Sequence, residues 1–254
     1  MKRSLIAFFI AVFVFSLAAE AQRSHRRSSP AKPAATPCPG VYDITDCADE
    51  GCGGNPELNK RKNIRSDEQA STLRSIQWMK DLKKPPKADC GEENRDTLKE
   101  LGEGQKITVI AWALAARKGG QETCNCKLKV PQDTDNHIVL VDPALEDSTL
   151  DANEDDSETA EFTPRVRLDH PSFTQEKLEP LIDPDWNPGD TPRKGKLLVR
   201  VTGLLMFDSE HYCGRHLTRH NDWEIHPVLK LEYCPEGQTC RPESDENWKN
   251  LESE

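Results

Sequence analysis

The chain has 254 residues, a formal net charge of −10 and nine cysteines. This negative net charge argues against nonspecific binding to the phosphate backbone of nucleic acids. Because nine is an odd number, at least one thiol must be free or must pair between chains.

Residues 1–21 have the pattern of a secretory signal peptide. Lys2 and Arg3 supply the positive start, an apolar run covers 5–17, and a small-x-small cleavage pattern follows at 19–21. The run is shorter than the roughly 20 residues of a membrane span, and no later stretch is long and apolar enough for one. We therefore expect an exported protein, periplasmic or extracellular, without a transmembrane segment after signal cleavage.

The next two segments differ sharply in composition. Residues 22–37 are basic and rich in Ser, Pro and Ala, which predicts a disordered linker. Residues 38–101 form a cysteine-rich, partly helical extension. Within it, apolar residues recur every three positions over 66–82, which predicts a helix that ends before Pro85 and Pro86.

All nine cysteines are disulfide candidates, since export favours disulfides over zinc ligation. Their pairing does not follow from the sequence: Cys38, Cys47, Cys52, Cys90, Cys124, Cys126, Cys213, Cys234 and Cys240. Cys124 and Cys126 flank a single residue, so we expect them to take separate partners rather than each other. A thiolate metal site at this pair is the alternative. Cys234 and Cys240 bracket a Pro-Glu-Gly turn and suit a short disulfide loop.

Residues 102–235 carry five strand patterns and one helix pattern. The strands fall at 106–117, 137–141, 160–168, 196–207 and 223–234, the helix at 172–182, and a mobile acidic insert at 146–158. Three strands, a helix and two strands is the order of the OB-fold, a five-stranded Greek-key barrel. We predict a mainly β protein with an OB-like barrel of five strands, one short helix, the cysteine-rich extension before it and an acidic tail at 236–254. A β-sandwich is the alternative, because strand order alone does not fix closure.

The last predicted strand, 223–234, alternates between apolar and polar residues over most of its length. Glu224 and His226 fall on its polar face, two residues apart, and therefore point the same way within about 7 Å of each other. Such a pair can bind a metal or move a proton. It can equally belong to a solvated strand face, or satisfy a bulge at Pro227, which cannot donate a ladder hydrogen bond.

Three segments resemble strand motifs of a group of exported bacterial proteins. Residues 135–140 are similar to the group's D-x-H strand, and residues 221–229 to its N-x-[aromatic or aliphatic]-E-[I/L]-H-P-V-L strand. Residues 203–211 are similar to its G-x-x-F-x-D-x-x-H strand exit, with a glycine-to-phenylalanine spacing one residue longer. The resemblance covers 105–234. It implies an exported barrel-like domain with a shared polar cluster, and it implies no activity.

The polar residues of these segments form the candidate site. The second and fifth strands of an OB barrel can lie on adjoining surfaces, which would bring together Asp135, His137, Asp208, His211, Glu224 and His226. Imidazoles with a carboxylate suit zinc or another divalent ion that keeps an open position for water. Equally, Glu224 can orient His137 or His226 as a base. Walker, G-x-S-x-G, H-E-x-x-H and dinucleotide motifs are absent.

Three functional interpretations remain open at this point, and whether the protein is an enzyme is undecided among them. The first is an exported, disulfide-stapled OB-like module that binds an extracytoplasmic ligand: a metal, a glycan, a peptide or a partner protein. The second is a metal-dependent hydrolase of phosphodiesters or esters that uses the His/Glu/Asp cluster. The third is a structural, envelope-associated module in which these side chains bond to neighbouring backbone.

Overall fold

The structure is a computed structural model that describes residues 36, 38–85, 95–145, 148–190, 195–212 and 218–253. The expected signal peptide, nearly all of the expected linker, and Cys90 and Cys213 lie outside the described residues. Within the part of the chain that is described, no helix combines the length and the apolar character needed to cross a bilayer.

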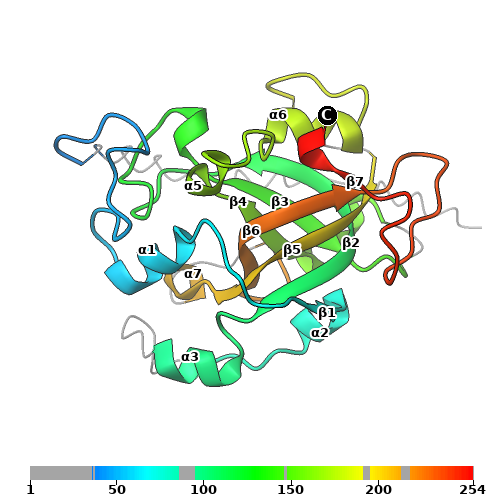
Figure 1. Cartoon of the computed structure of the whole chain (residues 1–254), viewed down its shortest axis with the longest axis horizontal. Helices are drawn as coiled ribbons and strands as arrows, with labels where there is room; N and C mark the ends of the chain where they lie inside the picture. Colours follow the sequence, from blue (N-terminus) through cyan, green and yellow to red (C-terminus); the bar gives the residue numbers. More distant parts are fainter. Residues whose placement is uncertain are drawn as a thin grey trace, which may run out of the picture. The chain divides into compact units, whose positions relative to one another are not determined.

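Five strands close into a mixed barrel (Figure 1): β2 (Lys106–Lys118), β3 (Asn136–Val141), β4 (Glu158–Phe162), β5 (Leu197–Phe207) and β6 (Trp223–Tyr233). Around the barrel the order is β2-β3-β4-β6-β5 and back to β2, with β4 and β6 parallel and the other pairs antiparallel. This is the strand order of an OB-fold, so the predicted barrel is confirmed. The sheet closes because β2 is long enough to pair with β5 along its first part and with β3 along its second.

The barrel interior follows from the alternation that the sequence shows. In β3, β4 and β5 one parity supplies the fully buried apolar core, which includes Ile138, Phe162 and Val201. In β2 and β6, whose pairings contain register shifts, the parity changes along the strand, so Ala116 and Val228 belong to the core as Ile107 and Trp223 do. Gly203 lets β5 and β6 approach closely where their register shifts, since an added Cβ would lie 2.3 Å from the carbonyl oxygen of Pro227. Helix α6 (Gln175–Ile182) packs on β2 and adds Leu178 and Ile182 to the same core.

Within the described ranges, two short strands and six further helices surround the barrel. Strand β1 (Thr72–Arg74) runs parallel to β2, and β7 (Lys249–Asn250) pairs with β6. The helices are α1 (Pro56–Lys62), α2 (Ile76–Lys80), α3 (Arg95–Leu101), α4 (Leu150–Asn153), α5 (Pro164–Arg167) and α7 (Ser209–Tyr212), with 3-10 turns at Pro131–Asp133, Glu154–Asp156 and Leu251–Ser253. The predicted acidic tail contains β7 and the fully buried Leu251.

Several predicted elements were wrong in type or extent. The helix expected over 66–82 is instead β1 followed by α2, because Thr72–Arg74 add to the edge of β2 and Ser75 caps a new helix at Trp78 N. The strand expected at 160–168 is β4, which starts earlier and stops at Phe162. Thr163 then caps α5, whose first residue is a proline.

Two smaller corrections concern the segment 146–158 and the start of helix α6. The acidic insert expected as a mobile loop at 146–158 contains α4 and a 3-10 turn within its described residues. The helix expected from Ser172 begins at Gln175, because the side chain of Thr174 accepts a hydrogen bond from Lys177 N. In both places a local cap or turn sets the boundary of the helical segment. The pattern of apolar residues does not reveal such a cap or turn.

Three disulfides are present among the described residues: Cys38–Cys52, Cys47–Cys126 and Cys234–Cys240. The short loop predicted for Cys234 and Cys240 is therefore confirmed. Within the same residues Cys124 is the cysteine without a disulfide, and it is buried. The expectation that Cys124 and Cys126 each take a disulfide partner is therefore wrong for Cys124, whereas Cys126 pairs with Cys47. A free thiol agrees with the odd cysteine count, and disulfides of this number fit an oxidising compartment.

Candidate functional site

The polar cluster lies on the outer wall of the barrel, underneath the cysteine-rich extension. Ile138, Ala160 and Ile225 belong to the core, so the alternating residues His137, Glu161 and Glu224 point to the opposite side of the strands. That face is not solvated: Glu224 is 0% and His226 is 1% exposed. The alternative interpretation from the sequence, that Glu224 and His226 lie on a solvated strand face, is therefore wrong.

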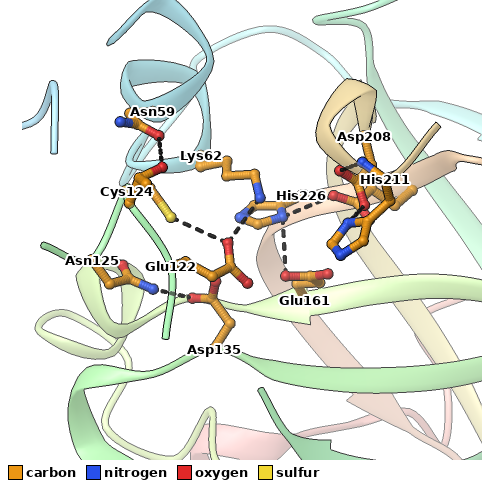
Figure 2. Close-up of polar contacts among 12 residues, drawn as sticks. Asn59, Lys62, Glu122, Cys124, Asn125, Asp135, Glu161, Asp208, His211 and His226 are labelled. Atoms are coloured by element: carbon orange, nitrogen blue, oxygen red, sulfur yellow. Dashed lines mark hydrogen bonds and ion pairs between the residues drawn. The ribbon is translucent and has the colours of Figure 1, made fainter. Parts of the chain in front are cut away.

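Helix α1 and the 122–126 loop cover this face, and each is held by buried amide side chains. Asn59, Lys62 and Asn63 share one face of α1 because they are spaced by three and four residues. Asn63 Nδ2 donates to the carbonyl of Cys124 at 3.0 Å, and Asn59 Oδ1 accepts from Thr123 Oγ1 at 3.0 Å. Lys62 is thereby aimed from α1 toward the cluster (Figure 2).

The packing of the extension against the loop also depends on Gly51. Its φ is +62°, and a Cβ there would lie 2.2 Å from the carbonyl oxygen of Thr123. Cys52 N donates to that same carbonyl at 2.8 Å, and the Cys47–Cys126 disulfide joins the two segments nearby. The extension therefore fixes the loop that carries Glu122 and Cys124.

Glu161 of β4 is the centre of the cluster. Its Oε1 lies 3.4 Å from Nε2 of His137, and its Oε2 lies 3.1 Å from Nδ1 of His226. The same Nδ1 is 3.1 Å from Oε1 of Glu224. One carboxylate thus contacts an imidazole from β3 and another from β6, the strands on either side of β4.

A chain of ion pairs leads from Glu224 to the surface. Arg219 donates to Glu224 Oε2 at 2.7 Å and to Asp208 Oδ2 at 2.6 Å. Asp208 Oδ2 is also 2.5 Å from Nδ1 of His211, whose side chain is about half exposed. The predicted residues Asp208 and His211 are therefore linked to Glu224 and His226 through an arginine.

A second branch lies on the side of the 122–126 loop. Lys62 Nζ donates to Glu122 Oε2 at 2.8 Å, and the Cys124 thiol donates to the same oxygen at 3.4 Å. Asp135 is completely buried; its Oδ1 accepts from Asn125 Nδ2 at 3.1 Å, and its Oδ2 makes no hydrogen bond to any described residue. Among the same residues, Nε2 of His226 has no hydrogen-bond partner, and Nε2 of His137 has none beyond its 3.4 Å ion pair with Glu161.

Burial and neighbouring charges raise the pKa values of some of these groups and lower those of others. Burial raises the pKa of Asp135 to about 7, and the nearby charge of Glu122 adds to that rise. Burial also acts to raise the pKa of Glu161, but the charges of His137 and His226 outweigh it and hold that pKa well below its usual range. For His226, burial acts to lower the pKa, and contact with Glu161 overcomes it, so the pKa lies well above the usual value.

A small cavity of about 140 Å³ opens beside the cluster. Its walls include Glu122, His137, Glu161, Asp208, His211 and Arg219. Two larger pockets, of about 660 and 640 Å³, are lined by other residues. The cavity is therefore the route by which a small ligand can reach this face of the barrel.

Among the residues that the structure describes, three sets of side chains have donor atoms close enough to hold one metal ion. In each set the donor atoms lie within 4.8 Å of one another: Glu122, His137 and Glu161; Glu122, Cys124 and Asp135; Asp135, Glu161 and His226. Any two of these sets have one carboxylate residue in common, so the three sets adjoin one another. The first set lines the cavity, whereas the third is buried.

Of the six residues predicted from sequence, Asp135, His137 and His226 belong to these sets, and Glu224 contacts His226. Asp208 and His211 join the network through Arg219 rather than directly. The sequence reasoning missed Glu161, Glu122 and Lys62. Glu161 could have been found, because it lies between Ala160 and Phe162, two core residues of one strand; no sequence signal distinguishes Glu122 or Lys62 from surface charges.

Comparison of the chain with protein-family models, with curated proteins and with solved structures finds no match.

Proposed function

We propose that the protein is an exported, disulfide-stapled OB-like module that binds a divalent metal ion through Glu122, His137 and Glu161. The observation that carries the proposal is the geometry of these three side chains. Their donor atoms lie within 4.8 Å of one another, they line the 140 Å³ cavity, and Nε2 of His137 makes no hydrogen bond to the described part of the chain and faces Glu161 at 3.4 Å. One imidazole and two carboxylates suit zinc, and three protein ligands leave a position open toward the cavity.

The ion pairs around the cluster support a metal ion at Glu122, His137 and Glu161. Glu224 and Asp208 are paired with Arg219, and Oε2 of Glu122 with Lys62. The ion pairs of Glu161, by contrast, are with His137 and His226. Imidazoles bind metals in their neutral form, so a metal ion can replace the proton that otherwise balances Glu161.

The test is the metal content of the disulfide-bonded chain, measured by elemental analysis after zinc loading and dialysis. We expect about one ion per chain from this set, and its loss in His137→Ala and Glu161→Gln. His220→Ala is the matched control, because His220 is as exposed as His137 (40% against 38%) and also faces a carboxylate, Asp156. Circular dichroism verifies that each variant is folded. A His137→Ala protein that keeps all its metal would overturn the proposal, as would a wild-type protein without any.

The second candidate function, hydrolysis of a phosphodiester or an ester, draws support from Asp208 and His211. His211 lines the same cavity, and its hydrogen bond to Asp208 raises the pKa of the imidazole, which suits a proton donor to a leaving group. Activity toward model phosphodiesters and esters that needs both zinc and His211 would support this function. Equal rates for wild type and His211→Ala would exclude that role for the residue.

A further inference from the structure

Cys124 is the cysteine that the disulfides of the described residues leave over. It is 1% exposed and lies two residues from Cys126, which is bonded to Cys47. A small apolar side chain would fill a buried position as well as a thiol does. The environment of Cys124 is nevertheless polar, because its Sγ lies 3.4 Å from Oε2 of Glu122.

A second buried group points to the same place. Asp135 is completely buried, its Oδ2 has no hydrogen-bond partner within the described part of the chain, and donor atoms of Asp135, Glu122 and Cys124 all lie within 4.8 Å of one another. A buried carboxylate oxygen without a partner is costly unless a cation or a donor faces it. Lys62 contacts Glu122, whereas the donor to Asp135 Oδ1 is the neutral amide of Asn125.

We propose that Cys124, Glu122 and Asp135 form a second metal site, which takes a thiophilic divalent ion of the zinc class. A thiolate with two carboxylates favours zinc or cobalt over magnesium or calcium, which prefer oxygen ligands alone. Glu122 belongs to this set and to the first, so the two ions would share it. The inference deepens the proposed metal-binding function and rests on it for the shared ligand.

Binding at this site has a defined proton balance. The metal ion forms a bond to Sγ of Cys124, the S–H bond breaks, and its proton leaves to the buffer, with no change in oxidation state. Burial and the charge of Glu122 raise the pKa of the free thiol well above its usual range, so the thiolate forms only with the metal. The carboxyl of Asp135, when protonated, releases a proton in the same way.

Cobalt reports this site directly, because a bound thiolate gives Co²⁺ a charge-transfer absorption in the near ultraviolet. The experiment titrates the disulfide-bonded full chain with Co²⁺ and follows that absorption together with the number of ions bound. We expect two ions and a thiolate band in the wild type. Cys124→Ala should lose the band and keep one ion, and His137→Ala should keep the band and lose one ion.

Asp135→Asn provides a second variant, which keeps the acceptor for Asn125 and removes the charge. We expect it to weaken the Co²⁺ affinity measured by the thiolate band at least tenfold, even if Cys124→Ala proves unstable. If the wild type binds one ion and shows no thiolate band, the inference of a second site is overturned, whereas the proposal of the first site is retained. A thiolate band that survives Cys124→Ala would overturn it as well, whereas no bound ion at all would remove both proposals.

Discussion

Glu161 and His226 form an ion pair in the interior of the protein, with 3.1 Å between Oε2 and Nδ1 and at most 5% of either side chain exposed. Their strands, β4 and β6, run parallel, with Thr159 beside Glu224 and Ala160 beside Ile225. The next positions in this register are Glu161 and His226. The closure of the barrel therefore creates the pair, since the two residues are far apart in sequence and adjacent only across β4 and β6.

Replacing Glu161 by glutamine should destabilise the metal-free protein. The imidazolium of His226 would keep Glu224 and lose its other carboxylate, and breaking one partner of a buried pair costs roughly 3 kcal/mol. Urea unfolding at neutral pH measures the change in the free energy of unfolding. Glu176→Gln is the control, since its ion pair with Lys118 is more than 40% exposed on both sides and should contribute less than about 1 kcal/mol. Equal losses in both variants would contradict a special role for the buried pair.

Lys62→Met should have opposite effects on folding and on metal binding. The ammonium group lies 2.8 Å from Glu122 with 5% of the side chain exposed, so its removal leaves a poorly compensated carboxylate and should cost roughly 3 kcal/mol without metal. The same ammonium competes with a metal for Glu122, so we expect zinc to bind the variant about tenfold more tightly, a gain of about 1.4 kcal/mol. Calorimetric titration measures the affinity, and Lys60→Met, which removes an exposed lysine, is the control. Weaker zinc binding by Lys62→Met would show that the lysine supports the site.

Glu179 should make a contribution to stability that falls as the pH rises from about 4 to 7. Burial raises the pKa of Glu179 to about 7, whereas the unfolded carboxyl titrates near 4.3. Between these values the folded state holds a proton that the unfolded state has lost. Glu179 therefore lowers the free energy of unfolding by about 1.4 kcal/mol per pH unit over this range, and its loss ends above pH 7.

Glu179→Gln isolates this contribution, because the amide oxygen can still accept the hydrogen bond from Ala116 N. We expect the variant to gain roughly 3 kcal/mol relative to wild type between pH 4 and pH 7.5, measured by urea unfolding across the range. Glu176 is again the control: burial raises its pKa, but the hydrogen bond from Lys118 outweighs this and the net pKa is lowered. A stability difference between Glu179→Gln and wild type that stays constant with pH would show that Glu179 is ionised in the folded state.

The disulfides should contribute unequally to stability. Cys47–Cys126 joins residues 79 positions apart, whereas Cys234–Cys240 joins residues six apart. In the chain-entropy model the first contributes about 4 kcal/mol and the second about 2 kcal/mol. Paired serine substitutions and denaturant unfolding check the order. Only the first pair should also weaken metal binding, because it holds the loop of Glu122 and Cys124; a larger loss from the second pair would contradict this account.

Much of the barrel could be predicted from the sequence because local pattern decides it. The strands at β2, β3, β5 and β6 alternate or run apolar over their whole length, and they were placed to within one or two residues. The errors fell where a tertiary contact or a cap overrides periodicity. Leu73 fits a helical spacing, yet its segment pairs with β2, and Thr163 ends β4 by starting a new helix.

The sequence by itself determined the order of the strand segments along the chain. It also determined that Glu224 and His226 share the polar face of the last strand, because a period of two leaves a strand only two faces. The odd count of nine cysteines further determined that at least one thiol is free or pairs between chains. Only the tertiary structure decided that this outer face is buried. Lys62 reaches it from the cysteine-rich extension and Glu122 from the 122–126 loop, and the Cys47–Cys126 disulfide joins the two segments. Burial turns side chains that would be solvated on an open strand into a coupled set of charges, since the electrostatic interactions of charged groups grow as water is excluded.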